Sequence, residues 1–106
     1  MRRILIIDDN PAVGQALTLL LSLHDIVAEV ALTPEAGLAA LDRRPADVVI
    51  QDMNFSADTT SGAEGAALFR AIRERQPDLP VILLTAWTRL EAAVELVKAG
   101  AADYLA

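Results

Sequence analysis

The amino-acid sequence predicts an α/β domain: an open, five-stranded parallel sheet with helices on both faces. Two observations support this prediction. Five short β-type runs alternate with four helical patterns along the 106 residues, and right-handed crossovers turn that order into a three-layer fold. The first, third and fourth runs are continuously apolar over most of their length rather than alternating. Such runs indicate strands buried on both faces, as in a parallel sheet.

The expected strands are short and mostly apolar. They are Ile4–Ile7, Ile26–Val30, Asp47–Ile50, Val81–Leu84 and Ala102–Leu105. Because all five strands run in the same direction, their carboxyl ends lie along one edge of the sheet. Ligands bind at that edge in sheets of this kind.

The first two helices are expected to begin at an N-cap side chain followed by proline. Asn10-Pro11 opens the first helix, and Thr33-Pro34 opens the second, which runs to about Leu41. Proline suits the first helical position because its missing N–H would have no partner there. Apolar spacing in the first helix predicts a buried stripe formed by Val13, Ala16, Leu17 and Leu20.

The third and fourth helices are expected to begin at capping boxes, in which Ser or Thr is followed three residues later by Glu. The boxes are Ser61-x-x-Glu64 and Thr88-x-x-Glu91, and Gly100 ends the fourth helix. The residues expected to face the core are Leu68, Phe69 and Ile72 in the third helix and Leu90, Ala93, Val94 and Val97 in the fourth.

Composition excludes several classes of protein. The net charge of −6 and the pI near 4.5 argue against contact of this domain with nucleic acid or an anionic membrane. The absence of cysteine excludes a disulfide framework and a thiolate metal site. The apolar run Ile4–Ile7 is shorter than the about 7–15 residues of a signal peptide, and no run reaches the ~18 residues of a membrane span. We therefore expect a cytoplasmic domain.

Acidic residues follow two of the expected strands at the ligand-binding edge. Asp8 and Asp9 end the first strand, Asp52 follows the third, and Thr85 follows the fourth. Each residue alone could be a solvated turn or a helix cap. Together, three carboxylates and a hydroxyl on one edge, with no polar residue expected inside the strands that lead to them, favour a reactive site.

Three crowded carboxylates favour a bound cation. Two unit charges ~4 Å apart repel by about 1 kcal/mol in water and by about 4 kcal/mol at an effective dielectric constant of 20. No basic residue stands beside them in the sequence, and oxygen-only ligands favour Mg²⁺ or Mn²⁺. Such an ion leaves positions open for phosphate oxygens, which indicates phosphoryl transfer with one carboxylate as the nucleophile.

These motifs resemble the receiver domain of two-component response regulators over essentially the whole chain. The matching segments are ILIIDDN, DVVIQDMN, PVILLTA and KAGAADYLA. The resemblance implies one receiver domain over residues 1–106, with a flavodoxin-like sheet of strand order 2-1-3-4-5. It also implies a phosphoacceptor switch, not an enzyme, that assists its own phosphorylation and dephosphorylation.

The resemblance assigns a role to each residue at the edge. Asp52 is the residue phosphorylated from a phosphohistidine of a sensor histidine kinase. Asp8 and Asp9 bind Mg²⁺ together with Asp52 and the main-chain carbonyl of Asn54.

The resemblance also implies how the switch is read. The Thr85 hydroxyl hydrogen-bonds a phosphoryl oxygen, and Tyr104 is the aromatic residue that turns inward when Thr85 moves. A downstream output domain, expected to regulate transcription, responds to this change. The segment NFSADTTSG after Asp52, with TSGAEG and LLTAW, is similar to receivers of NtrC-type transcription activators.

The chain departs from the family at its end. The lysine and proline that the family carries directly after DYLA are absent, because the chain stops at Ala106, and the final helix is missing. We therefore expect a C-terminally truncated receiver. A packed helix that covers about 300 Å² contributes roughly 7 kcal/mol at ~25 cal/mol per Å². The face it leaves is expected to be covered by a second copy, giving a homodimer, or by an exchanged element.

Two other functions stay open on the sequence alone. The chain could be a receiver-like interaction module that is not phosphorylated, although the complete acidic triad speaks against this. It could also be a fragment of a haloacid-dehalogenase-type phosphatase, whose D-x-D motif Asp52-Met53-Asn54 loosely matches. That reaction needs a second acid where Asn54 stands.

Overall fold

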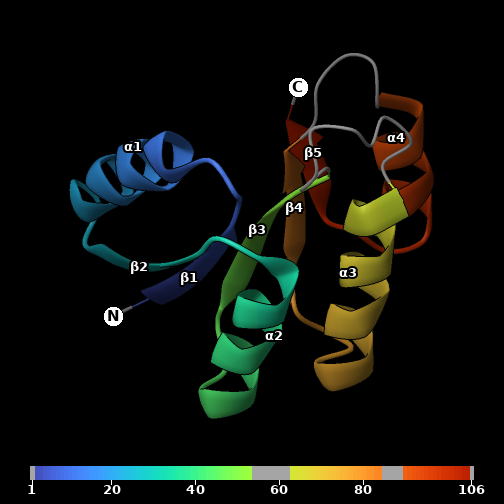
Figure 1. The fold of residues 1–106 in the computed structure, drawn as a ribbon, viewed down its shortest axis with the longest axis horizontal. Coiled ribbons are helices and arrows are strands. Elements are labelled where there is room, and N and C mark those ends of the chain that lie inside the picture. The colour runs from blue at the N-terminus through green and yellow to red at the C-terminus, as the bar shows by residue number, and fades with distance from the viewer. Residues whose placement is uncertain (1, 54–62, 85–89, 106) are drawn as a thin grey trace.

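The computed structural model describes residues 2–53, 63–84 and 90–105, without the side chains of residues 90–93 and 103–105. Strands and helices alternate along these residues (Figure 1). The elements are β1 (Arg2–Ile7), α1 (Pro11–Ser22), β2 (Ile26–Ala31), α2 (Pro34–Arg43), β3 (Val48–Asp52), α3 (Ala63–Arg75), β4 (Val81–Leu84), α4 (Leu90–Lys98) and β5 (Asp103–Leu105). In this part of the chain no helix is both long and apolar enough to cross a membrane.

The five strands form one parallel sheet in the order β2-β1-β3-β4-β5. The predicted α/β class and strand order are therefore confirmed. The register pairs Ile7 of β1 with Gln51 of β3, and Asp52 of β3 with Leu84 of β4. The carboxyl ends of these three central strands consequently lie side by side at one edge.

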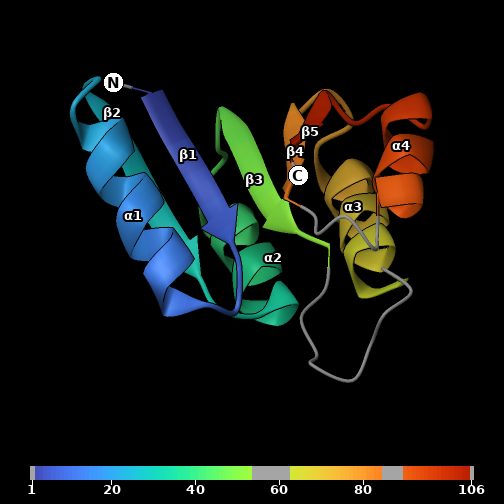
Figure 2. The same cartoon turned by 90° about the horizontal axis from the view of Figure 1, so that it is seen from above.

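The helices divide between the two faces of the sheet. α1 lies on one face, and α2 and α3 lie on the other, with α4 beside α3 (Figure 2). The main core fills the face with α2 and α3, where Leu68, Phe69 and Ile72 of α3 are buried as predicted. In α4, Val94 and Val97 are half-buried, whereas the side chains of Leu90 and Ala93 lie outside the described part of the structure.

The opposite face is less well covered. The predicted buried stripe of α1 is wrong for Ala16, which is exposed, and for Leu20, whose side chain is 53% exposed. The helix approaches β2 through Gly14, where a methyl group would lie 2.7 Å from Cγ1 of Val30. Because contact is centred on this glycine, the buried face of α1 is rotated away from Ala16 and Leu20, and Leu17 is only half-buried.

The N-caps predicted for the first two helices are confirmed. The Asn10 side chain accepts a hydrogen bond from Ala12 N at 3.0 Å, and the Thr33 hydroxyl accepts one from Ala36 N at 3.1 Å. α2 continues to Arg43, two residues beyond the predicted end. The predicted caps Ser61 and Thr88 lie outside the described residues.

The third strand differs from its prediction at both ends. Asp47 was expected to open the third strand, but β3 begins at Val48, because the Asp47 carboxylate accepts a hydrogen bond from Arg3 N at 2.8 Å. The same strand extends past Ile50 through Gln51, which is fully buried. The expectation that no polar residue lies inside these strands is therefore wrong.

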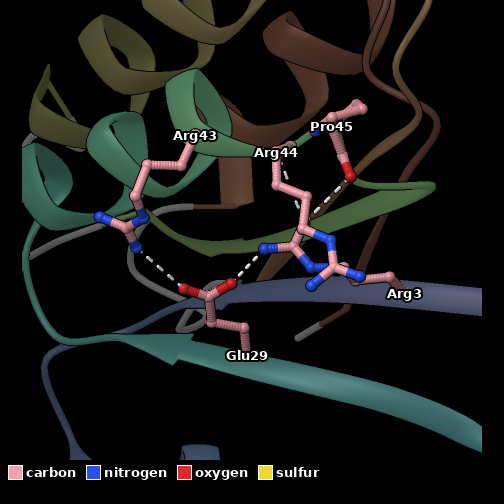
Figure 3. Close-up of polar contacts among 5 residues, drawn as sticks. All are labelled: Arg3, Glu29, Arg43, Arg44 and Pro45. Atoms are coloured by element: carbon pink, nitrogen blue, oxygen red, sulfur yellow. Dashed lines mark hydrogen bonds and ion pairs between the residues drawn. The ribbon is translucent and has the colours of Figure 1, made fainter.

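An arginine cluster joins the sheet to the end of α2 (Figure 3). Arg3 forms an ion pair with Glu29 and donates hydrogen bonds to the main-chain carbonyl oxygens of Arg44 at 3.3 Å and Pro45 at 3.0 Å. Glu29 forms a second ion pair, with Arg43 at 3.2 Å. The side chain of Arg3 is 12% exposed and that of Arg43 is 67% exposed. The two ion pairs thus share one carboxylate but differ in burial.

Removal of the buried arginine is expected to cost far more stability than removal of the exposed one. Arg3→Met removes the donor shared by the carbonyl oxygens of Arg44 and Pro45 and by Oε1 of Glu29, which then keeps only its exposed partner Arg43 among the described residues. This should lower the free energy of unfolding by about 1–3 kcal/mol. Arg43→Met, the matched control, should lower it by less than about 1 kcal/mol, because exposed ion pairs contribute little. Urea unfolding of the two variants measures the difference, and equal losses would contradict this assignment.

Candidate functional site

Three carboxylates converge at the carboxyl ends of β1 and β3. Asp8 and Asp9 directly follow β1, and Asp52 is the last residue of β3. One carboxylate oxygen from each residue lies within 4.8 Å of the other two. The convergence follows from the parallel pairing of β1 with β3, which sets the two strand ends next to each other. Residues far apart in sequence thereby form one acidic group.

The three acids differ in exposure and in local support. Asp8 is 5% exposed, Asp52 is half-buried and Asp9 is exposed. Asp8 is held on both sides, because its N–H donates to Ala31 O at 3.0 Å and its Oδ1 accepts from Asn10 N at 2.9 Å. This turn orients the Asp8 carboxylate and places Asn10 as the N-cap of α1.

Burial is the main electrostatic influence on Asp8. It raises the pKa of this carboxyl above the ordinary value of 3.8, the N–H of Asn10 lowers it in part, and the charge of Asp9 raises it further. The ionised form of Asp8 is therefore unfavourable in the folded protein. A proton relieves this at low pH, and a cation can relieve it at neutral pH.

The donor set fits a hard divalent cation. Oxygen ligands alone favour Mg²⁺ or Mn²⁺ over zinc or copper. Six ligands about 2.1 Å from Mg²⁺ lie at most about 4.2 Å from one another, slightly less than the 4.8 Å found here. Asp9 is exposed, so a small rotation of its side chain could close this difference.

The other residues expected at this site are described only in part. Asn54 and Thr85 lie outside the described residues. Tyr104 lies in β5, where it pairs with Leu83, and its side chain is also outside the description. Leu84, which precedes Thr85 in the chain, is the register partner of Asp52. β4 therefore ends beside the strand that carries the central acid.

Sequence reasoning missed two residues at this edge, Gln51 and Gly65. The side-chain Nε2 of Gln51 donates to the carbonyl oxygen of Gly65 at 2.8 Å and to that of Asp52 at 3.3 Å. The N–H of Gly65 donates to Met53 O at 3.1 Å, and a methyl group at Gly65 would lie 2.5 Å from Met53 Cα. Two sequence signals were available: an amide inside an apolar strand, and a glycine in the first turn of a helix.

Nearly the whole chain matches one known protein family. Residues 4–106 match the family described as the response regulator receiver domain. It is a response regulator receiver domain. Members of this family act as signalling switches in two-component systems, and the predicted family is confirmed.

Relatives of this receiver domain include transcription regulators. The response regulator protein FleR of Pseudomonas aeruginosa is 41% identical over 105 residues, which are 97% of this chain and 21% of FleR. The DNA-binding transcriptional regulator NtrC of Salmonella typhimurium is 33% identical over 100 residues, which are 94% of this chain and 20% of NtrC. The chain thus spans about a fifth of these relatives, and the predicted similarity to NtrC-type receivers is confirmed.

A solved structure shares the fold of this receiver domain. The response regulator protein TrrA of Thermotoga maritima, in complex with Mg²⁺–BeF, superposes with a TM-score of 0.81 at 27% identity. The match covers 99% of this chain and 85% of TrrA. The arrangement of sheet and helices described above is therefore that of a known receiver domain.

A methyl group at Gly65 is expected to disturb both the fold and the site. Gly65→Ala brings a side chain against the Met53 main chain, which cannot rotate away, and should lower the free energy of unfolding by about 1–3 kcal/mol. Gly14→Ala is the matched control, because its methyl group meets the side chain of Val30, which is 38% exposed and can move. Urea unfolding should show the larger loss for Gly65→Ala, and the opposite order would contradict the close approach of α3 to β3.

Replacement of Asp8 by Asn should change the stability in opposite directions with and without Mg²⁺. The pKa of Asp8 is raised above 3.8 in the folded protein. The contribution of this carboxyl group to the stability of the folded protein is therefore complete below pH 3.8, and it is lost as the pH rises through the folded-state pKa. At pH 7 without Mg²⁺, we therefore expect Asp8→Asn to melt at a higher temperature than the wild type.

With Mg²⁺ at ~100 times its dissociation constant, the wild type gains about 2.7 kcal/mol, and Asp8→Asn should gain less because it offers a weaker ligand. The order of melting temperatures should then reverse. Thermal unfolding with and without Mg²⁺ measures both effects. If the order of the two proteins stays the same in both conditions, Asp8 is not a metal ligand.

Proposed function

We propose that this receiver domain accepts a phosphoryl group on Asp52 from the phosphohistidine of a sensor histidine kinase. Asp8, Asp9, Asp52 and the main-chain carbonyl of Asn54 would bind the Mg²⁺ or Mn²⁺ that this reaction requires. The proposal rests on the oxygens of three acids that lie within 4.8 Å of one another at the open edge of the sheet. The similar TrrA structure was determined with Mg²⁺–BeF, which supports a cation at the matching edge.

Asp52 is suited to be the acceptor by its position. It ends a buried strand and is half-buried itself, so the carboxylate is held by the sheet and is still open to a donor. One Oδ of Asp52 forms a bond to phosphorus while the P–N bond of the donor breaks, and the electron pair of that bond stays on the imidazole. The bound cation would offset negative charge on the phosphoryl oxygens.

Asp8 and Asp9 are suited to bind the cation, and Asp52 to react. Asp8 is oriented by the N–H of Asn10 and shielded from water, so its carboxylate has little freedom to approach the phosphorus. Attack of water on the acyl phosphate returns Asp52 to a free carboxylate and releases phosphate. The domain would therefore act as a resettable switch that is phosphorylated on its own Asp52.

The neighbouring strands provide a route from the phosphoryl group to an output domain. The Thr85 hydroxyl would hydrogen-bond a phosphoryl oxygen, and Tyr104 would follow the movement of Thr85. This is supported by the register, because Leu84 pairs with Asp52 and Leu83 pairs with Tyr104. We place residues 1–106 as one cytoplasmic receiver domain joined to an output domain that regulates transcription, as the name of the relative NtrC indicates for that protein.

Phosphorylation by a small donor tests the acceptor directly. Incubation with acetyl phosphate and Mg²⁺ should add the mass of one phosphoryl group, and fragmentation should place it on Asp52. Asp52→Asn should abolish the addition, because an amide oxygen is a poor nucleophile. Asp78→Asn, in an exposed turn between α3 and β4, should react like the wild type.

Two results would contradict this proposal. Phosphorylation that persists in Asp52→Asn would show that another residue is the acceptor. Repeated hydrolysis of a phosphate monoester such as p-nitrophenyl phosphate would instead favour a phosphatase.

A further inference from the structure

The side chain of Gln51 is a polar group in an apolar layer. It is fully buried on β3, on the same face as Val49 and Met53, which belong to the main core. Its Nε2 donates to two carbonyl oxygens, Asp52 O and Gly65 O. Because both partners are acceptors, the amide can present only its NH₂ group to them, which settles its orientation.

The other end of the same amide is unsatisfied. Among the residues that the structure describes, no hydrogen-bond donor reaches Oε1 of Gln51. A buried oxygen without a donor lowers stability, and an apolar side chain of similar size would fill the position without that loss. A buried polar group of this kind needs a reason for its presence.

The contacts of Gln51 complete a two-way link between β3 and α3. Gly65 donates its N–H to Met53 O, and its carbonyl oxygen accepts from Gln51 Nε2. The first turn of α3 is thus bonded to the residue before Asp52, through the Gln51 side chain, and to the residue after it, through the Met53 carbonyl oxygen. A methyl group at Gly65 would lie 2.6 Å from Met53 O, so the two main chains are about as close as they can be.

We propose that Gln51 is a positioning residue for Asp52. Its amide fixes the peptide that joins Asp52 to Met53 and couples occupation of the Asp52 site to the first turn of α3. This inference rests on the proposed phosphorylation of Asp52. It assigns α3 a part in sensing the phosphoryl group, in addition to the route through Thr85 and Tyr104.

The test compares two glutamines that receive the same change. Gln51→Met keeps the size of the side chain and removes its hydrogen bonds. Gln76→Met is the matched control, because Gln76 also has a buried Oε1 without a donor among the described residues but lies between α3 and β4 at the far end of the sheet. Three quantities are measured on the full chain: the phosphorylation rate with acetyl phosphate and Mg²⁺, the urea midpoint, and amide hydrogen exchange in the first turn of α3.

In the wild type and in Gln76→Met, Mg²⁺ with beryllium fluoride should slow amide exchange at residues 65–68. In Gln51→Met this slowing should be lost, and phosphorylation should be about tenfold slower because the acceptor is misplaced. The urea midpoint of Gln51→Met should change little, because the loss of the hydrogen bonds to Gly65 O and Asp52 O is offset by removal of the unsatisfied oxygen. A purely structural role would instead lower the midpoint and leave the response of α3 intact.

The inference is overturned if Gln51→Met retains both the phosphorylation rate and the slowed exchange, or if both glutamine variants lose them equally. It is also overturned if the wild type shows no response in α3. If no phosphoryl group is found on wild-type Asp52, the proposed function fails, and this result is independent of the role of Gln51. The role of Gln51 is then tested by amide hydrogen exchange with Mg²⁺ alone. It is supported only if Mg²⁺ slows exchange in the first turn of α3 in Gln76→Met but not in Gln51→Met.

Discussion

Repulsion among the carboxylates of Asp8, Asp9 and Asp52 is the constraint on which the rest of the structure depends. Two unit charges ~4 Å apart repel by about 4 kcal/mol at an effective dielectric constant of 20, a large fraction of the about 5–15 kcal/mol that stabilises a domain. The acids stay together because they end strands that cannot move apart, since β1 and β3 are hydrogen-bonded along their length and buried in the centre of the sheet. The stability of the core therefore maintains a group of like charges that a bound cation would neutralise.

The face of the sheet that carries α2 and α3 gives the site its rigidity. Gly65 brings α3 into contact with the main chain of Met53, and the buried amide of Gln51 bonds the same turn to Asp52 O. Neither feature is expected from packing alone, because a methyl group would not fit at Gly65 and Gln51 buries an oxygen without a donor among the described residues. Local departures from good packing are typical of sites whose geometry serves a function. The helix on the opposite face, α1, is only partly buried.

Sequence patterns predicted the fold and the acidic group well, and missed what depends on close contact. The strand order and the convergence of Asp8 with Asp52 follow from apolar runs and parallel topology, which leave few alternatives. The stripe of α1 was misjudged because helical periodicity does not show that contact is centred on Gly14. Gln51 was overlooked for a related reason. Whether a polar residue in a strand faces a helix turn depends on tertiary structure, and its partner Gly65 lies fourteen residues away in the chain.

The distribution of charge favours a cation at the acidic group. Arg3 lies near the start of β1, and its cluster partner Arg43 is the last residue of α2. Five steps of about 3.3 Å along the strand separate the Cα atom of Arg3 from that of Asp8, roughly 16 Å. That distance is about two Debye lengths at physiological ionic strength, where the Debye length is about 8 Å. Arginine charge at the far edge is therefore largely screened from the acids. Under the proposed function, a phosphoryl donor is itself an anion that would approach a chain of net charge −6, so its charge would have to be balanced within a few ångströms of Asp52. A divalent cation bound by the same three acids would meet this requirement, because it would turn the residues that repel the donor into the ligands of a positive charge that attracts it.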